Sequence, residues 1–226
     1  MNLRFSVSKI ELYRKFREEA YNGYFSQQDV IDTITGVAPP AGPDADWGTA
    51  YHSLIEGKHF SEVEGGLLVH PPELENGIFI PTAEAAPAIW FRLQHPQMVY
   101  EVPLWWDCTI GGHNVRVSMR IDGIEGLELH DTKTSKNPMD LQAYADSHQW
   151  RLYCLATSAQ RFHYDHFHRH ILKTGTTIKY QTCSFLPYIG MEKDCRMLIE
   201  NFIHFCTIHN LLDYVADKKQ YSELSF

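Results

Sequence analysis

The stretch RIDGIEGLELHDTKT (120–134) decides the fold of this chain. Apolar and polar residues alternate on both sides of a Glu-Gly pair, which predicts two strands joined by a tight turn. Side chains two residues apart on a strand point to the same face, so Asp131 and Lys133 project together. Pairing of the two strands brings Asp122 alongside them. The sequence therefore predicts a hairpin that gathers two carboxylates and one ammonium group.

Helices and further strands are predicted around this hairpin. The predicted helices are 8–24, 46–57, 82–94, 140–158 and 191–216, and the predicted strands are 99–107, 113–124, 127–134, 163–172 and 176–186. This order is typical of an α/β fold with a mixed β-sheet flanked by α-helices. We expect a single domain over residues 1–226, with 36–46 as a flexible loop and 58–96 as an insertion or small helical subdomain.

Local signals refine these elements. Ser8 and Glu11 predict a capping box at the start of the first helix, and Asp140 predicts the cap of the fourth. Pro103 predicts that its strand lies at a sheet edge or carries a bulge. Residues 58–81 show no clear periodicity, and we expect them to be irregular.

Composition limits the class of protein. A chain of 226 residues with 44% apolar residues is long enough for one full hydrophobic core. Five cysteines, an odd number with no CxxC pair, argue against a disulfide framework. No stretch approaches the roughly 18–20 apolar residues of a membrane span, and the first residues lack the apolar core of a secretion signal. We expect a soluble, cytoplasmic protein with no membrane partner.

The formal charge of −8, taken alone, argues against a nucleic-acid binder, because phosphate contacts need Lys and Arg. A local basic groove on an acidic body is compatible with this charge. Carboxylates that hold metal ions also count as negative only until the ions bind.

Asp122, Asp131 and Lys133 together suit metal-assisted hydrolysis of a phosphodiester. The carboxylates offer oxygen ligands to one or two hard cations, which activate a bound water. The lysine can orient that water or stabilise the charge that develops on the phosphate. The alternative is a cross-strand salt bridge, since Asp-x-Lys occurs often by chance in strands.

Two neighbouring segments add residues of the same chemistry. His52 and Glu56 are four residues apart and share one face of a predicted helix, where a histidine can reach a metal held by carboxylates. Gln149 and Tyr153 have the same spacing directly after the hairpin, and both side chains can contact phosphate. The alternatives are a half-buried histidine and a core tyrosine.

These segments together resemble a known family. In order, GTAYHSLIEG (48–57), RIDGI (120–124), ELHDTKT (128–134) and QWRLY (149–153) resemble the successive motifs of the RecB-like branch of the PD-(D/E)XK nuclease superfamily. The segment FSVSKIELYRKFREEAYNGY (5–24) is similar to the opening helix of that branch. The resemblance implies a restriction-endonuclease-like α/β fold.

The resemblance also implies roles for individual residues. The implied metal site comprises His52, Asp122, Asp131 and the backbone carbonyl of Thr132, with Glu56 behind it, while Lys133 is the catalytic lysine and Gln149 and Tyr153 hold DNA. The implied activity is that of a phage-type or recombination exonuclease. Such an enzyme uses Mg²⁺ or Mn²⁺ and a metal-activated water on linear DNA ends, in recombination or repair.

Some questions stay open at this point. A nucleic-acid-binding subunit with a vestigial nuclease site, or a nuclease acting on RNA, would carry similar residues. A second copy of the chain or a recombination protein is a further candidate partner.

Two other features concern metals. Many relatives carry a four-cysteine iron–sulfur cluster, but the first predicted helix has no cysteine and Cys183, Cys195 and Cys206 are widely spaced, so we expect no cluster. HYDHFHRH (163–170) holds four histidines, of which the even-numbered ones share a strand face. That face is either a second metal site or an exposed, weakly basic surface.

Overall fold

The computed structural model describes residues 1–18, 21, 23–37, 42–173 and 175–217. The helices are α1 (Val7–Arg17), α2 (Gln27–Thr35), α3 (Pro43–Ile55), α4 (Thr82–Gln94), α5 (Leu141–Asp146), α6 (Gln149–Thr157), α7 (Met191–Ile208) and α8 (Leu212–Val215). The strands are β1 (Asn2–Ser6), β2 (Phe60–Val63), β3 (Gly66–Val69), β4 (Ile78–Pro81), β5 (Val99–Ile110), β6 (His113–Glu125), β7 (Glu128–Ser135), β8 (Arg161–Leu172) and β9 (Gly175–Phe185).

A mixed sheet forms the centre of the molecule. Its strands follow the order β1-β6-β7-β8-β9, and β5 pairs with the other edge of β6. β1 and β8 run parallel to their neighbours β6 and β7, whereas the β5–β6, β6–β7 and β8–β9 pairs are antiparallel. The predicted mixed α/β sheet flanked by helices is therefore confirmed. β5 lies at a sheet edge, as Pro103 predicts, and its pairing extends from Val99 to Ile110.

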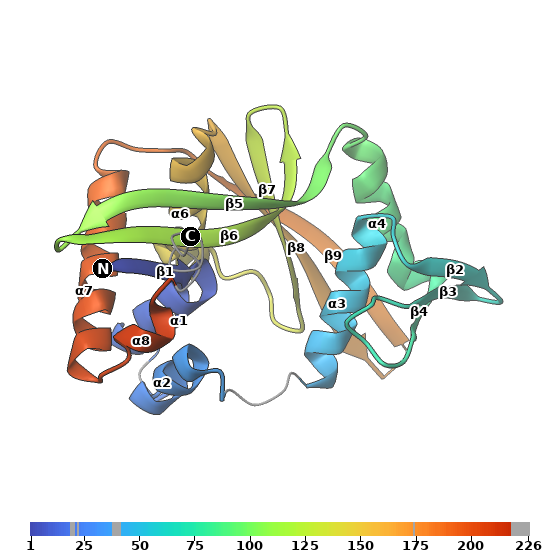
Figure 1. Cartoon of the computed structure of the whole chain (residues 1–226). Coiled ribbons are helices and arrows are strands. Elements are labelled where there is room, and N and C mark those ends of the chain that lie inside the picture. The colour runs from blue at the N-terminus through green and yellow to red at the C-terminus, as the bar shows by residue number, and fades with distance from the viewer. Residues whose placement is uncertain (19–20, 22, 38–41, 174, 218–226) are drawn as a thin grey trace, which may run out of the picture.

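Two apolar clusters hold helices against the sheet. The larger contains side chains of α1, α6 and α7 packed on β1, β6 and β8, with Phe5, Tyr13 and Phe202 at its centre. The smaller joins α3 and α4 to β3, β4 and β8 through rings such as Phe91 and Phe167. Figure 1 shows α1, α7 and α8 toward one end of the sheet and α3, α4 and the small strands toward the other.

The segment 58–81 differs from expectation. It forms a separate three-stranded sheet of β2, β3 and β4, where irregular structure was predicted. The strands have only four residues each, too few for an alternating pattern to stand out in sequence. Residues 58–96 thus contain a β-meander as well as the predicted helix α4, so this segment is not helical throughout, and its assignment as an insertion stays a prediction.

The predicted loop 36–46 is shorter than expected. Residues 38–41 lie outside the described part of the chain. Helix α3 already begins at Pro43 with Gly42 as its N-cap, rather than at Asp46. Proline suits the first turn of a helix because its missing N–H is not needed there.

The start of α1 also differs. Residues 2–6 form a strand that pairs in parallel with β6, and the helix begins directly after it with Ser6 as N-cap. The predicted capping box of Ser8 and Glu11 is wrong. The Glu11 carboxylate instead accepts hydrogen bonds from Nε of Arg14 at 3.0 Å and from the backbone N–H of His148 at 2.5 Å. A tertiary contact thus replaces the local one.

Two predicted long helices are each divided. Residues 140–158 form α5 and α6, which separate at Ser147, and the predicted Asp140 cap is confirmed by its bond to the Ala143 N–H at 3.0 Å. Residues 191–216 form α7 and α8, and between them Asn210 adopts a positive φ of 55°. The first division matters for function because it places Gln149 at the first turn of α6.

Candidate functional site

Asp122 and Asp131 lie where β6 and β7 separate. The two strands pair at three positions, and continuing their register by one residue would set Asp122 opposite Asp131. The strands diverge instead, and Asp122 bridges the gap with its side chain. Its Oδ2 accepts a hydrogen bond from the backbone N–H of Thr132 at 2.7 Å. Both carboxylates thus converge on one opening in the sheet.

Lys133 lies beside the second carboxylate. Its Nζ is 2.5 Å from Oδ2 of Asp131. Asp131 is only 2% exposed, whereas 34% of the Lys133 side chain reaches solvent. The ammonium group therefore compensates a buried charge and remains within reach of a ligand. Asp122 of β6 and Asp131 and Lys133 of β7, the three residues that the sequence predicts to lie together, are close to one another in the structure.

Helix α6 contacts the pair of Asp131 and Lys133 through a hydrogen bond to Asp131. The Gln149 amide donates to Oδ1 of Asp131 at 3.1 Å, and it also lies 3.4 Å from the hydroxyl of Tyr153. Tyr153 is 2% exposed, and its hydroxyl donates to the backbone carbonyl of Arg120 at 2.7 Å. In this arrangement Tyr153 holds β6 and Gln149 in place. Its predicted contact with DNA stays a prediction.

Helix α3 supplies His52 and Glu56. The Nδ1 of His52 is 3.7 Å from Oδ2 of Asp122, close enough for both to share a cation. Glu56 follows the last turn of α3 and pairs with Lys58 at 2.9 Å. Both residues line the same hollow as Asp122. The backbone N–H of Thr132 is also at the site, and its carbonyl as a ligand stays a prediction.

The electrostatics of the site favour a cation. Burial raises the pKa of Asp122 and of Asp131 to about 6, although Lys133 works against this rise. Burial, assisted by Lys133, lowers the pKa of His52 to about 4, so its imidazole is neutral at pH 7. Burial also opposes the charged form of Lys133, but Asp131 and Asp122 outweigh it and raise the lysine pKa. A bound cation would offset the cost of burying these two carboxylates in their charged form.

The donor set fits a hard divalent ion. Two carboxylates and a neutral imidazole are suitable ligands for Mg²⁺ or Mn²⁺, which keep several waters when protein ligands are few. Within the described residues, the tightest groups of ligand atoms lie elsewhere, and His52, Asp122 and Asp131 do not all approach within 4.8 Å. Lys133 occupies the position next to Asp131 instead. Binding of an ion therefore requires a small closure or bridging waters.

Two hollows meet at this site. One of about 510 Å³ extends along β5 and β6 and is lined by Glu56, Arg120 and Asp122. The other, of about 650 Å³, extends toward Lys136 and Arg169. Thr49 and His52 of α3 line both hollows, and Asp122 lines the smaller one.

Most cations along these hollows have acidic partners. Lys136 lies 2.6 Å from Asp44, and Arg120 lies 2.6 Å from Glu101. The local charge is thus nearly balanced, in keeping with the acidic composition of the chain. A polyanion would have to displace these partners or approach with its charge already reduced by metal ions.

Glu101 and Arg120 are site residues that the sequence analysis missed. Glu101 lies across from Asp122 on β5, at a point where the register passes directly from Tyr100 to Val102. Its φ of 57° is unusual for a residue with a side chain, and such strain is often found at functional sites. The register is the same on both sides of Glu101, so no residue is inserted, and no signal in the sequence marks this position.

Comparisons with known proteins address the fold. No protein-family model matches the sequence, and no curated protein matches it significantly. A solved structure described as "Crystal structure of SSO0001" is similar over 90% of this chain and 76% of its own, with a TM-score of 0.52 and 14% identity. At this identity the likeness concerns the α/β fold alone. Among the described residues, no helix is long and apolar enough to cross a membrane.

Proposed function

We propose that this protein is a metal-dependent DNA nuclease of the RecB-like PD-(D/E)XK type. The observation that carries the proposal is the convergence of Asp122 and Asp131 at the opening between β6 and β7, with Lys133 paired to Asp131. A salt bridge alone would not need a second carboxylate at the same opening. It would also not need the amide of Gln149 to orient the Asp131 carboxylate.

Each residue has a defined part in the proposed reaction. Asp122 and Asp131, with neutral His52 beside them, would hold Mg²⁺ or Mn²⁺. Such an ion supplies Lewis acidity toward water and neutralises phosphate charge when bound. Lys133 would shift from Asp131 toward the phosphate and stabilise the charge that develops on its oxygens. Gln149 keeps Asp131 oriented, so that its lone pairs face the opening.

The groove supports a nucleic-acid substrate. The two hollows share Thr49 and His52 of α3; Asp122 lines the smaller one, and Lys136 and Arg169 line the larger one. Action on linear ends, a role in recombination or repair, a cytoplasmic location and association with a second copy or a recombination protein rest on the family resemblance. They form the finer part of the proposal.

A panel of substrates tests the activity. Linear, circular and end-labelled DNA, with matched RNA, is incubated with the full chain and Mn²⁺, Mg²⁺ or EDTA. We expect metal-dependent loss of linear DNA with circles intact, and no cleavage by Asp131→Asn. Cleavage of circles would indicate an endonuclease. Cleavage of RNA alone would show that the substrate is RNA rather than DNA. Tight DNA binding without cleavage in any metal would favour the binding subunit with a vestigial site. Iron analysis of the purified protein tests the expected lack of a cluster.

A further inference from the structure

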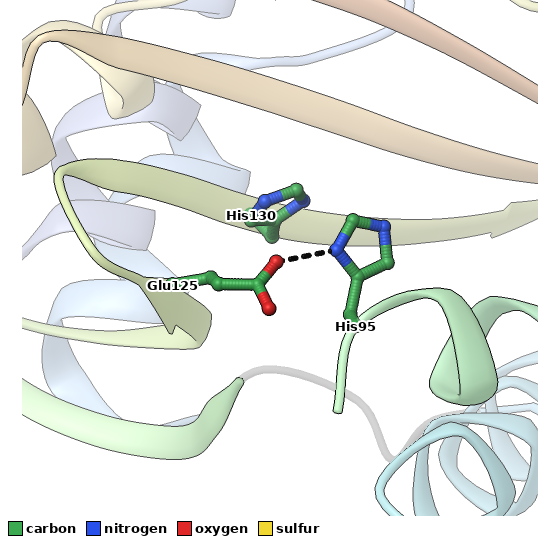
Figure 2. A group of neighbouring side chains, drawn as sticks. All are labelled: His95, Glu125 and His130. Carbon is green, nitrogen blue, oxygen red and sulfur yellow. Dashed lines mark hydrogen bonds and ion pairs between the residues drawn. The ribbon is translucent and has the colours of Figure 1, made fainter. Parts of the chain in front are cut away.

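We propose that His95, Glu125 and His130 form a second metal site, suited to Zn²⁺ or a similar borderline ion. One ligand atom from each residue lies within 4.8 Å of the other two. Figure 2 shows the three side chains pointing toward one another from separate parts of the chain. Two imidazoles and one carboxylate are a ligand set that zinc accepts.

The fold brings these residues together on the opposite face from the nuclease carboxylates. His95 ends α4, Glu125 ends β6 and His130 lies near the start of β7. Side chains alternate along a strand, so His130 faces away from its neighbour Asp131. The register pairs Gly123 with His130, and the side chain of Met98 lies over this glycine.

The orientation of His130 is the observation that points most directly to a metal. Its Nδ1 is 2.7 Å from Oδ2 of Asp165, and the two residues are 3% and 1% exposed. Asp165 is fixed in turn by the hydroxyl of Tyr180 at 2.6 Å. Metal-binding histidines commonly donate one ring N–H to a carboxylate in this way, which leaves the other nitrogen free to coordinate.

The second nitrogen of His130 lacks a partner. Its Nε2 is buried and has no hydrogen-bond partner among the described residues. Buried polar atoms in proteins nearly always find a partner, and those that do not require an explanation. With Nδ1 bonded to Asp165, Nε2 carries the lone pair that a cation would use.

His95 and Glu125 complete the site from its solvent side. Nδ1 of His95 and Oε2 of Glu125 are 2.7 Å apart, and both side chains are partly exposed. Ligands about 2.0–2.2 Å from a tetrahedral zinc are roughly 3.3 Å from each other. Binding would therefore separate this pair by about 0.6 Å. The exposed side gives the ion access and leaves a fourth position for water.

A neighbouring group fits a metal less well. Glu128, His130 and His163 also have ligand atoms within 4.8 Å of one another. However, the rings of His130 and His163 are stacked, 4.6 Å apart and inclined by only 12°. Lone pairs of ring nitrogens lie in the ring plane, so two nearly parallel rings cannot aim at one ion. His95 and His130 are inclined by 60°, which allows their planes to meet.

A bound ion would tie three parts of the chain together. It would fix the end of α4 to the β6–β7 hairpin, the same hairpin that presents Asp122 and Asp131 on its other face. The site would thus anchor the nuclease carboxylates without touching the substrate.

Cobalt titration tests the proposal. Co²⁺ is added to the full chain carrying Asp122→Asn and Asp131→Asn, so that ions do not bind the nuclease carboxylates. We expect one equivalent to bind with the visible absorption typical of nitrogen-ligated, four- or five-coordinate Co²⁺, and Zn²⁺ to displace it. In the same background His95→Gln should weaken binding at least tenfold, and Asp165→Asn should weaken it about 10–100-fold. His163→Gln is the matched control and should leave affinity unchanged.

Three results would overturn the proposal. They are absence of Co²⁺ binding at millimolar concentration, binding that His95→Gln and Glu125→Gln both leave intact, and binding that His163→Gln abolishes. If His95→Gln does not fold, Glu125→Gln provides the same test from the exposed side of the site. Circular dichroism of each variant separates loss of the site from loss of the fold.

Discussion

The two faces of the β6–β7 hairpin offer ligands of different chemistry. One face carries carboxylates, Asp122 and Asp131, beside Lys133. The other carries His130, with Glu125 and His95 close by. Because consecutive strand residues point to opposite faces, one pair of strands serves both clusters. A cluster of hard oxygen ligands and one rich in imidazole can thus lie one residue apart along a strand and still be chemically separate.

The clusters also differ in how their charge is balanced. Burial raises the pKa of Asp122 and Asp131 to about 6, so both are mostly ionised at neutral pH and face the single ammonium group of Lys133. On the other face His130 is matched by Asp165 and His95 by Glu125. The first face therefore favours hard divalent ions through charge, and the second favours borderline ions through nitrogen ligands.

The largest expected effect separates the two faces. Asp122→Asn keeps an oxygen for the Thr132 N–H but removes a charge from the proposed ion site. We expect DNA cleavage in Mn²⁺ to fall on the order of 100-fold or more, with Zn²⁺ binding at the histidine site unchanged. His95→Gln should weaken Zn²⁺ binding at the histidine site and leave DNA cleavage in Mn²⁺ unchanged. Cleavage rates and Zn²⁺ titrations of both variants measure this. Equal loss of both properties in each variant would show that the faces are not separate.

The pH dependence of Mn²⁺ binding should report on the carboxylate face. The native pKa values of about 6 mean that Asp122 and Asp131 take up protons as pH falls through 6. Protons compete with the ion, so affinity falls toward acid, by up to about 100-fold per pH unit when two protons are displaced. Calorimetric titration between pH 8 and pH 5 measures this. Constant affinity down to pH 5 would contradict burial of ionised carboxylates in the metal-free protein.

Gly123 of β6 lies next to Asp122 in the chain and opposite His130 in the strand register, so a side chain there should disturb both clusters. A Cβ at this position would lie 2.3 Å from Sδ of Met98. Met98 is flexible enough to yield in part, so we expect Gly123→Ala to destabilise the protein by about 1 kcal/mol and to weaken both sites. Chemical denaturation measures the stability.

The smallest expected effect concerns the support beneath the carboxylates. Tyr153→Phe removes the hydrogen bond to the Arg120 carbonyl and keeps the buried ring. We expect a loss of about 1 kcal/mol in the free energy of unfolding, a modest reduction in cleavage and no change at the histidine site. Tyr214→Phe, at an exposed tyrosine, should change neither property. A severe loss of cleavage at normal stability would instead indicate direct contact of Tyr153 with DNA.

The hairpin and the larger strands could be predicted because their signals are local. Alternation and the turn glycine define β6 and β7 without reference to the rest of the chain. β1 was missed because five residues carry little pattern and their partner lies more than 100 residues away. The cap expected from Ser8 and Glu11 failed for the same reason, since Glu11 bonds to distant His148.

The site shows the same division. Asp122, Asp131 and Lys133 could be grouped from strand geometry. His52 and Gln149 were added from the helical spacing of neighbouring segments, and the family resemblance gave them roles. The imidazole site could not be foreseen, because His95 is about 30 residues from its partners in sequence. The histidine-rich strand β8 drew attention to its even-numbered residues. Of these, His166 and His168 are buried, so the alternative of an exposed basic face is wrong at these two residues. Odd-numbered Asp165 is the residue that contacts His130.

The rate of DNA cleavage by Lys133→Ala tests the central claim most directly. The variant is compared with the unaltered protein and with Lys179→Ala, which removes an exposed lysine from β9. End-labelled linear DNA and saturating Mn²⁺ are used throughout. We predict that Lys133→Ala lowers the rate about 100–1,000-fold, as loss of a charge-stabilising group does, while Lys179→Ala is unaffected. Full Mn²⁺-dependent cleavage by Lys133→Ala would contradict the assignment of this site.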